Sequence, residues 1–270
     1  MALYLQTNTA SLIAETYFNQ SNSQIQQSFT QLSSGYRINS AADDAAGLGI
    51  SENLNAQVQS YSVAAQNTSD AVSMVQTADG SADQIDNLLT RMRQLAVEAQ
   101  NGTMSANDQT NLNTEYQQDL SEIDRVAGDA TFNGTGLLAG AANTINFQVG
   151  INGTGNDQIA VTFGGVDTAG LNVTGTTVTS AGLTTTIDAA MQTLDTTRAG
   201  FGAAINRLQD ASSAISSTQT NLSSALSVIQ DVDVAQATSN LAREQVLAQA
   251  GASVLAQANQ APQLALKLLQ

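Results

Sequence analysis

The sequence predicts a mainly α-helical fold, a long antiparallel, coiled-coil-like helical bundle with a small β-hairpin region. The 270 residues include one proline, Pro262, so the commonest helix breaker is missing from nearly the whole chain. Aromatic residues make up only 4% and tryptophan is absent, so the core must consist of alanine, leucine, valine and isoleucine. Side chains of this size favour close helix–helix packing. Apolar residues also recur every three or four positions over long stretches, which is the spacing of amphipathic helices.

The two ends of the chain are nearly free of charge. Residues 1–34 contain one charged side chain, Glu15, and residues 245–270 contain one, Lys267. Because a solitary helix in water carries charge on its exposed face, we expect these ends to be helices that contact other protein on most sides and become ordered on assembly. The apolar residues predicted to pack between subunits are Leu12, Phe18, Ile25, Phe29, Leu32, Val254, Leu255, Leu264, Leu268 and Leu269.

The body of the chain carries two long apolar stripes, over residues 58–96 and 187–229, and the second runs through Met191 and Ile205. Each covers about 40 residues, or about 60 Å of helix, a length that indicates coiled-coil-like pairing. Two consecutive three-residue steps, Val72–Val75–Ala78, predict a local shift of the first stripe. A shorter stripe over residues 112–123 follows the loop at 101–103 and predicts a third helix.

Local signals mark where the first helix ends and the second begins. Gly35 is a plausible terminator after Leu32-Ser33-Ser34. The run from Ser40 to Asp43 has the form of a capping box, with aspartate in place of glutamate, and predicts a helix start there.

Residues 131–182 differ from the rest. Ile145, Phe147, Val149 and Ile151 alternate with polar residues, Asn152-Gly153 follows as a turn signal, and a second alternation covers residues 159–163. This pattern predicts a β-hairpin. The Thr/Gly-rich stretch that follows has strand propensity, and the zone contains no lysine or arginine.

Composition excludes most enzymatic chemistry. Neither cysteine nor histidine occurs, which rules out disulfides, Cys/His zinc sites and imidazole catalysis. The paired carboxylates Asp43-Asp44 and Asp231/Asp233 fit helix capping and solvation better than a metal or glycosidase site. We therefore expect no enzyme activity, no cofactor and no metal site.

Charge and hydropathy exclude other partners and routes. With 8 basic and 23 acidic residues, the net charge of −15 argues against nucleic acid or anionic membrane as a partner. The start of the sequence lacks the pattern of a secretory signal peptide, and no run of 18 apolar residues occurs. If the protein is exported, we expect a route without a cleaved signal.

Five motifs carry a resemblance to a known family. They are LSSGYRINSAADDAAGLGI (32–50), RMRQLAVEAQNGT (91–103), EIDRVAGDATFNG (122–134), FQVG (147–150) and AGASVLAQANQAPQLALKLLQ (250–270). In this order they closely resemble bacterial flagellins, over both ends and the helical body. Because the middle zone is short, the chain resembles a flagellin without large outer domains.

The resemblance implies a structural subunit that polymerises into the bacterial flagellar filament for swimming motility, secreted and extracellular. Gly47 and Gly49 would lie near the connection between tube and shell, where the chain bends or packs closely. The terminal helices would pair coaxially. The implied domains are residues 1–45 plus 230–270 as the terminal helical inner-tube domain, 46–130 plus 183–229 as the helical body, and 131–182 as a short β/variable outer segment of the body domain.

The resemblance also implies partners. These are further copies of the chain in a helical filament, a flagellar export chaperone, the type III export apparatus, and the hook–filament junction and cap proteins. The innate immune receptor TLR5 recognises flagellins through positions that match Arg91, Leu95 and Glu115, although Gln94 stands where the family often has an acidic residue.

Two other classes of protein fit the sequence less well. One is the hook–filament junction protein, which shares the end helices and is a minor component. The other is a secreted coiled-coil adhesin that acts as a monomer.

Overall fold

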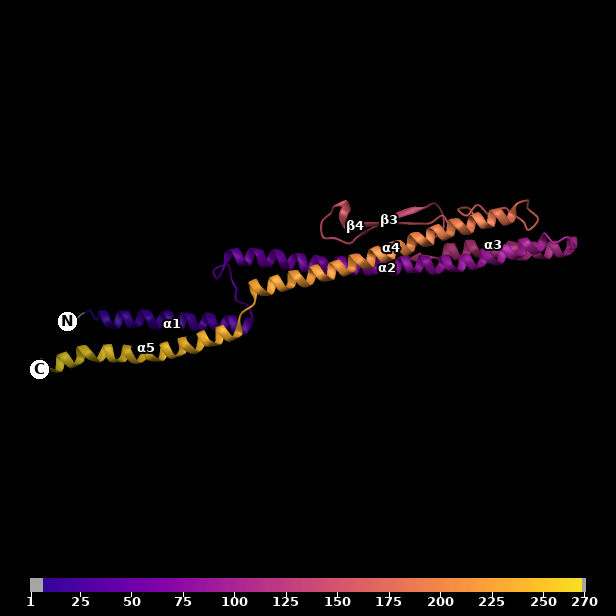
Figure 1. Cartoon of the computed structure of the whole chain (residues 1–270). Helices are drawn as coiled ribbons and strands as arrows, with labels where there is room; N and C mark the ends of the chain where they lie inside the picture. The colour runs from indigo at the N-terminus through magenta and orange to yellow at the C-terminus, as the bar shows by residue number, and fades with distance from the viewer. Residues whose placement is uncertain (1–6, 269–270) are drawn as a thin grey trace. The chain divides into compact units, whose positions relative to one another are not determined.

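The computed structural model describes residues 7–268, with side chains described for residues 7–260. The chain divides into two compact units, Met1–Ala56 with Asn221–Gln270, and Gln57–Thr220. The predicted mainly helical fold with a small hairpin is confirmed (Figure 1). The elements in order are α1 (Thr9–Ser34), α2 (Ala45–Ala99), α3 (Ala106–Asp129), β1 (Thr131–Phe132), β2 (Thr135–Gly136), β3 (Asn143–Gln148), the 3-10 helix η1 (Gly155–Asp157), β4 (Gln158–Phe163), α4 (Leu183–Gln230) and α5 (Val234–Leu268).

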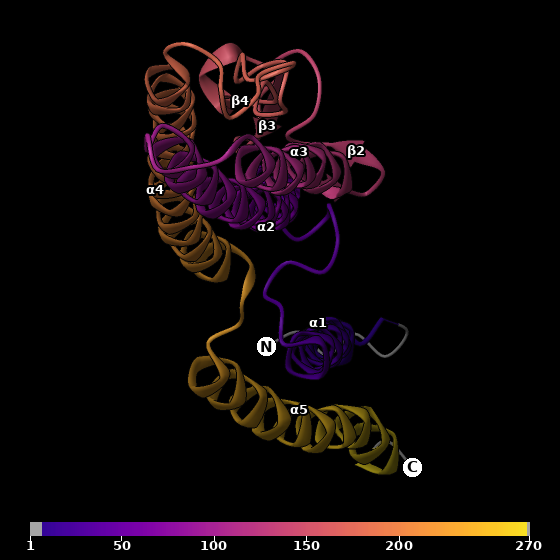
Figure 2. The same ribbon diagram turned by 90° about the vertical axis from the view of Figure 1, so that its right-hand side faces the viewer.

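The terminal helices α1 and α5 lie side by side and antiparallel (Figure 1), and Figure 2 shows α5 below α1, which is seen there nearly end-on. At one end of the pair, the Asn8 side-chain amide donates to the carbonyl of Ala258 at 2.8 Å. At the other end, the Val232 amide donates to the carbonyl of Gly35 at 2.9 Å. Gly35 ends α1 in the left-handed conformation, with φ of 77°, so the predicted terminator is confirmed.

The predicted capping box at residues 40–43 is wrong, because α2 begins only at Ala45. Asp43 instead accepts hydrogen bonds from the backbone and hydroxyl of Ser40 and from the Asn39 amide, which closes a turn before the helix. The helix is capped by Asp44, whose carboxylate accepts from the Gly47 amide at 2.8 Å.

Of the two glycines in the first turns of α2, only Gly47 lies in a crowded place. A Cβ there would come within 2.4 Å of the Asp44 carboxylate and 2.7 Å of the Ile38 side chain, whereas a Cβ at Gly49 would meet open space. Gly47 is therefore required for close packing, and Gly49 continues the helix without such a constraint.

The apolar stripe of α2 does not shift where the sequence predicted it. Ala71, not Val72, lies in the core, and Val72 is only partly buried. With Ala71 in place, steps of four and three residues alternate without a break, which is the 3.5-residue repeat of a coiled coil. The buried positions on this repeat are Ala64, Thr68, Ala71, Val75, Ala78, Ala82, Ile85, Leu89, Met92, Ala96 and Ala99, and Met74 and Leu95 are buried beside it.

The same alternation sets the core face of α4, and it differs from the stripe read from the sequence. Ala190 and Ala204 are buried where the sequence suggested their larger neighbours Met191 and Ile205. Close helix pairing favours a small residue at these positions, while the larger neighbour flanks the seam. The buried positions are Leu183, Ile187, Ala190, Leu194, Phe201, Ala204, Leu208 and Ile215.

The third helix, α3, packs in the same unit as the middle parts of α2 and α4. It starts at a capping box, in which Ser105 and Asp108 exchange side-chain to backbone hydrogen bonds. Tyr116, Leu120 and Ile123 are buried, in agreement with the predicted stripe.

The predicted hairpin is formed by β3 and β4, which pair antiparallel with Ile145 opposite Val161 and Phe147 opposite Ile159. The ring of Phe163 lies 5.6 Å from that of Phe201, which ties the hairpin to α4. The Thr/Gly-rich stretch at 164–182 forms turns and no strand, contrary to its propensity. Glycines with positive φ interrupt it at 164, 165, 175 and 182, while Val166, Leu171, Val173 and Val178 plug the core.

Candidate assembly surface and receptor-recognition residues

The inner face of the terminal pair holds α1 against α5. Residues predicted to pack between subunits lie here, partly buried within one chain: Phe18, Ile25, Leu32 and Leu255. On α1 they alternate with small residues in steps of four and three: Ala14, Phe18, Ser21, Ile25, Ser28 and Leu32. On α5, Gly251 lies against Phe18, where an added Cβ would lie 3.7 Å from the ring. The two helices therefore approach closely through small residues.

The outer face of the same pair remains exposed. Leu12, Phe29 and Val254, also predicted for subunit packing, expose 55%, 52% and 55% of their surface. Further exposed apolar residues that the sequence reading did not single out are Ile13, Tyr17, Val246 and Leu247. The signal that could have found them is their position off the four–three repeat of the inner face. The side chains of Leu264 and Leu268 lie outside those described, and Leu269 lies outside the described residues.

A shallow apolar groove runs between the two terminal helices, with a volume of about 310 Å³. Tyr17 and Phe18 line it from α1, and Leu247, Gly251 and Val254 line it from α5. It joins the exposed side chains of Tyr17, Leu247 and Val254 to the inner seam. Together with the groove, these three side chains form an exposed apolar strip of the kind that marks protein–protein contacts.

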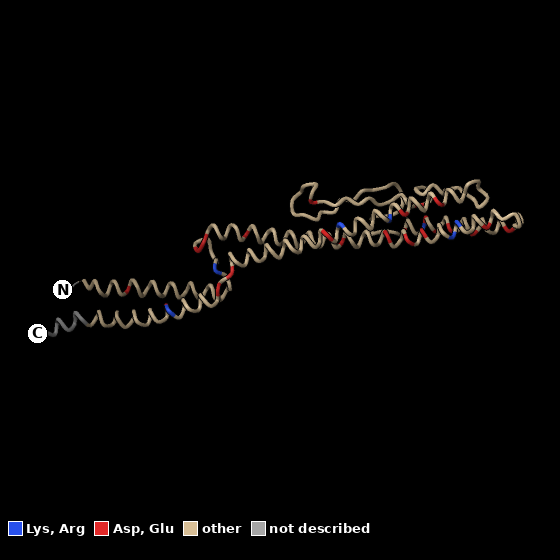
Figure 3. Tube along the Cα trace, in the orientation of Figure 1, with Lys and Arg blue, Asp and Glu red and all other residues tan. Residues whose placement is uncertain are grey.

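Charge is sparse along this strip, as Figure 3 shows by the few coloured positions on α1 and α5. The one charged residue of α1 is Glu15, and Arg243 and Glu244 lie near the start of α5. A surface that is apolar and nearly uncharged loses little solvation energy when another protein covers it.

The structure shows no cluster of metal ligands among the residues that it describes. No group of three or more histidine, cysteine, aspartate or glutamate residues there could hold a metal ion. None of the helices searched over the same residues is both long and apolar enough to cross a membrane.

The three residues predicted for receptor recognition lie on α2 and α3 and differ in access. Arg91 and Glu115 form an exposed ion pair, with the Arg91 Nε and Nη2 atoms 2.9 and 2.5 Å from the Glu115 Oε1 atom. The Glu115 carboxylate raises the pKa of Arg91 further. Leu95 is fully buried in the core, so it has no surface to offer a receptor directly. It lies one turn beyond Arg91 and supports the helix beneath it.

Asp119 lies one turn after Glu115 and extends this charged cluster inward. Its Oδ2 atom is buried without a hydrogen-bond partner. Burial raises the pKa of Asp119, the Glu115 charge raises it further, and Arg91 acts in the opposite direction. The other basic residue of this stretch, Arg93, is engaged elsewhere, with its Nε atom 2.6 Å from Asp188 on α4.

Comparison with known proteins gives a consistent result. The family model of the bacterial flagellin N-terminal helical region matches residues 5–143, and that of the C-terminal helical region matches residues 184–269. A flagellin of Halalkalibacterium halodurans is 37% identical over 252 residues, covering 91% of this chain and 92% of that protein. A flagellin of Xenorhabdus nematophila is 34% identical over the full length of both chains.

A filament protein and a solved structure extend the comparison. The flagellar filament 30.7 kDa core protein of Treponema maltophilum is 33% identical, covering 97% of this chain and 98% of that one. The crystal structure of Bacillus cereus flagellin is 34% identical, covers 60% of this chain and 94% of that one, and superposes with a TM-score of 0.48. The two family models between them span the terminal helices and most of the helical body, so this chain belongs to the bacterial flagellin family.

Proposed function

We propose that the chain polymerises through the exposed apolar strip of its paired terminal helices, and that the resulting filament serves swimming motility. As a flagellin, the chain is a structural subunit of the extracellular flagellar filament and not an enzyme. The observation that carries the proposal is the apolar, nearly uncharged strip around Tyr17, Leu247 and Val254, which a solitary protein would leave in contact with water.

The same contrast between uncharged ends and charged body supports a division of the chain into three parts. Residues 1–45 plus 230–270 form the inner tube, residues 46–130 plus 183–229 form the surrounding shell, and residues 131–182 face outward. Support comes from the distribution of charge, because most carboxylates and arginines lie on the helical body and would meet solvent on a shell.

Electron microscopy after addition of ammonium sulfate tests polymerisation. Sulfate is excluded from apolar surface and strengthens its burial, so full-length protein should form filaments. A variant lacking residues 1–30 should stay unpolymerised at every salt concentration. Filaments from the truncated chain, or a monomer under all conditions for the full chain, would contradict the proposal. A monomeric adhesin would keep its activity after the truncation, and a junction protein would be rare in isolated filaments.

Recognition by TLR5 is proposed for the monomer through Arg91 and Glu115, with Leu95 as packing support. An exposed guanidinium held in a fixed orientation by a carboxylate is a suitable anchor for a receptor. In a cell reporter assay, Arg91→Ala on α2 should lose most of the response. The control Arg125→Ala removes an exposed arginine on α3, away from Arg91, and should keep the response. No response to wild-type monomer at high dose would end this proposal.

Export partners are proposed from the character of α5. Its uncharged stretch from residue 245 to 266 suits an apolar groove of an export chaperone, before passage through the type III apparatus and assembly with the hook–filament junction and cap proteins. Full-length chain should form a stable complex with the chaperone by size-exclusion chromatography, and a chain ending at residue 247 should not. Equal binding of both would place the chaperone site elsewhere.

A further inference from the structure

Arg207 on α4 stands apart from the other arginines. It is exposed, and no carboxylate or hydrogen-bond acceptor contacts its guanidinium among the described residues. Each of the other six has at least one such partner, namely Arg37, Arg91, Arg93, Arg125, Arg198 and Arg243. In a chain with 23 acidic and 8 basic residues, an unpaired guanidinium is a scarce group.

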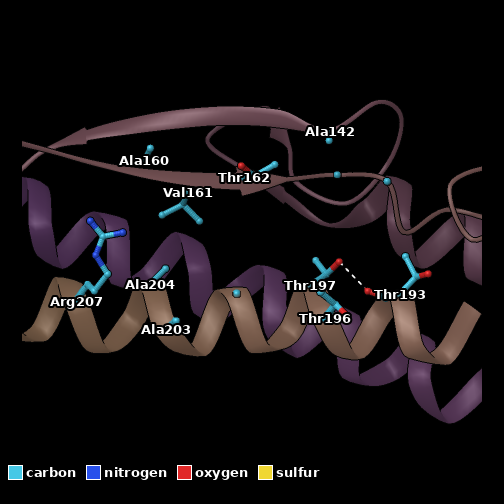
Figure 4. A pocket seen from close by; sticks show the side chains of 13 residues that line it. Ala142, Ala160, Val161, Thr162, Thr193, Thr196, Thr197, Ala203, Ala204 and Arg207 are labelled. Carbon is cyan, nitrogen blue, oxygen red and sulfur yellow. Dashed lines mark hydrogen bonds between the residues drawn. The ribbon is translucent and has the colours of Figure 1, made fainter. Parts of the chain in front are cut away.

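Arg207 lies at one end of a hollow of about 480 Å³ between β4 and α4 (Figure 4). Small side chains line the wall formed by α4, among them Thr193, Thr197 and Ala203. The volume is within the range of ligand sites, about 300–1,000 Å³. The hollow therefore has room for an extended backbone with small side chains, and the Arg207 guanidinium lies at its end.

The opposite wall of the hollow is a strand edge without a partner. The Val149 amide donates to the Asp157 carbonyl at 2.8 Å, which sets the residues of β4 that bond toward β3. By the alternation of an antiparallel ladder, the backbone groups of Ala160 and Thr162 point away from β3. They make no backbone hydrogen bond to other described residues. An unpaired edge of this kind is a template for a further strand.

We propose that an extended, carboxylate-bearing segment of a second copy of this chain pairs with the free edge of β4 and places its carboxylate on Arg207. The mode is strand addition, in which backbone hydrogen bonds give affinity and a side-chain contact gives register. A second copy is the occupant because self-assembly is the property of the family, and because its acidic surface complements the guanidinium. The inference rests on the proposed polymerisation.

Residue-resolved hydrogen exchange of monomer and filaments tests the strand edge. The Ala160 and Thr162 amides should exchange at least roughly tenfold more slowly in filaments, the change expected for a new backbone hydrogen bond. The Val161 amide, already directed toward β3, serves as the internal control and should change less. Filaments in which Ala160 and Thr162 exchange as fast as in the monomer would overturn the inference and leave polymerisation intact.

Substitution of Arg207 tests the charge contact. Arg207→Gln should raise the critical concentration for polymerisation by roughly tenfold, as expected for one lost charge-assisted hydrogen bond, and Arg207→Lys should restore most of the loss. Because Arg207 has no partner within the described chain, both variants should melt like wild type. The matched control, Arg125→Gln, removes an arginine outside the hollow and should polymerise normally.

Two further outcomes would overturn the inference. The first is an Arg207→Gln variant that polymerises like wild type, which would show that no carboxylate of a second copy binds Arg207. Alternatively, an unrelated oligoglutamate peptide added to the monomer could protect Ala160 and Thr162 while filaments leave them unprotected, which would make the occupant a foreign acidic peptide.

Discussion

At the scale of single residues, most of the few arginines stabilise the folded chain, with Arg207 as the exception. Arg198 of α4 faces three aspartates on successive turns of α2, at 3.2 Å from Asp79, 2.9 Å from Asp83 and 4.0 Å from Asp86. These carboxylates would repel one another without it. One guanidinium thus offsets three like charges along the seam between two helices.

Arg198→Gln should therefore lower the free energy of unfolding by about 1 kcal/mol, the upper range for a solvent-accessible ion pair. Raising the salt concentration should narrow the difference, because salt screens the remaining repulsion. Denaturant unfolding at low and high salt measures both effects. Arg198→Lys is the matched control and should lose less, and a Gln variant as stable as wild type at low salt would contradict the role given to Arg198.

Replacing Asp119 should raise the free energy of unfolding, whereas replacing Arg198 should lower it. Its pKa is higher in the folded chain than in the unfolded one, so the folded state binds the proton more tightly. The stabilisation from this group is complete below the unfolded pKa and is lost as pH rises through the folded pKa. At neutral pH, Asp119→Asn should raise the free energy of unfolding by up to about 1 kcal/mol, because no charge is then buried without a partner.

Urea midpoints at neutral and mildly acidic pH check this expectation. The advantage of Asp119→Asn should shrink as the wild-type carboxyl becomes protonated. Asp129→Asn is the control, since Asp129 is an exposed carboxylate on the same helix that pairs with Arg125. A gain for Asp119→Asn that persists unchanged in acid would exclude a titrating group as its cause.

At the scale of elements, the core positions of the long helices alternate in steps of four and three residues, and the sequence predicted only part of them. The apolar spacing predicted α2, α3, α4 and the hairpin, and the uncharged ends predicted α1 and α5. The spacing nevertheless selected Val72 and Met191 where the core takes Ala71 and Ala190. Hydrophobicity ranks valine above alanine, whereas the distance between paired helices decides which of two neighbours fits the seam. That distance is a tertiary quantity, so spacing alone could not supply it.

The candidate site was likewise predicted only in part from the sequence. The uncharged ends of the chain predicted an assembly surface, and the structure separates the predicted residues into a partly buried set with Phe18 and an exposed set with Leu12. The start of α2 was misplaced because Ser40 and Asp43 form a turn with the same residue types as a capping box. Only the course of the backbone distinguishes the two.

The cap of α3 gives a test at this scale. Ser105→Ala should destabilise the unit that contains α3 by about 1 kcal/mol, as for other helix caps. The hydroxyl and the backbone of Ser105 also lower the pKa of Asp108, so this part of the stability is present above the unfolded pKa and is lost as pH falls through the folded pKa. Thermal unfolding followed by circular dichroism should show a wild-type advantage that declines in acid. Ser105→Thr should melt like wild type. An unchanged melting temperature for Ser105→Ala would show that the cap does not stabilise the unit.

At the scale of the whole molecule, the distribution of exposed apolar side chains separates folding from assembly. Of the large apolar residues that are exposed among the described side chains, only Val63 and Val97 belong to the unit of residues 57–220. The others belong to the unit built around α1 and α5. The surface of the unit of residues 57–220 is thus suited to contact with water. The terminal unit exposes apolar surface that does not contribute to the core of the single chain.

Neighbouring residues Tyr17 and Phe18 make this separation testable. Tyr17 exposes 65% of its surface, whereas Phe18 faces α5 across Gly251. Tyr17→Asp should leave the monomer's circular dichroism and melting unchanged, since water already solvates the site. It should raise the critical concentration for polymerisation by more than about tenfold, because a charge would be buried between copies. Phe18→Asp should instead weaken the pairing of α1 with α5 in the monomer itself, visible as a loss of helicity. Tyr17→Asp should be compared directly with Phe18→Asp: if only Phe18→Asp failed to polymerise, the strip around Tyr17 would take no part in assembly. Assembly would then depend on another face of the paired helices.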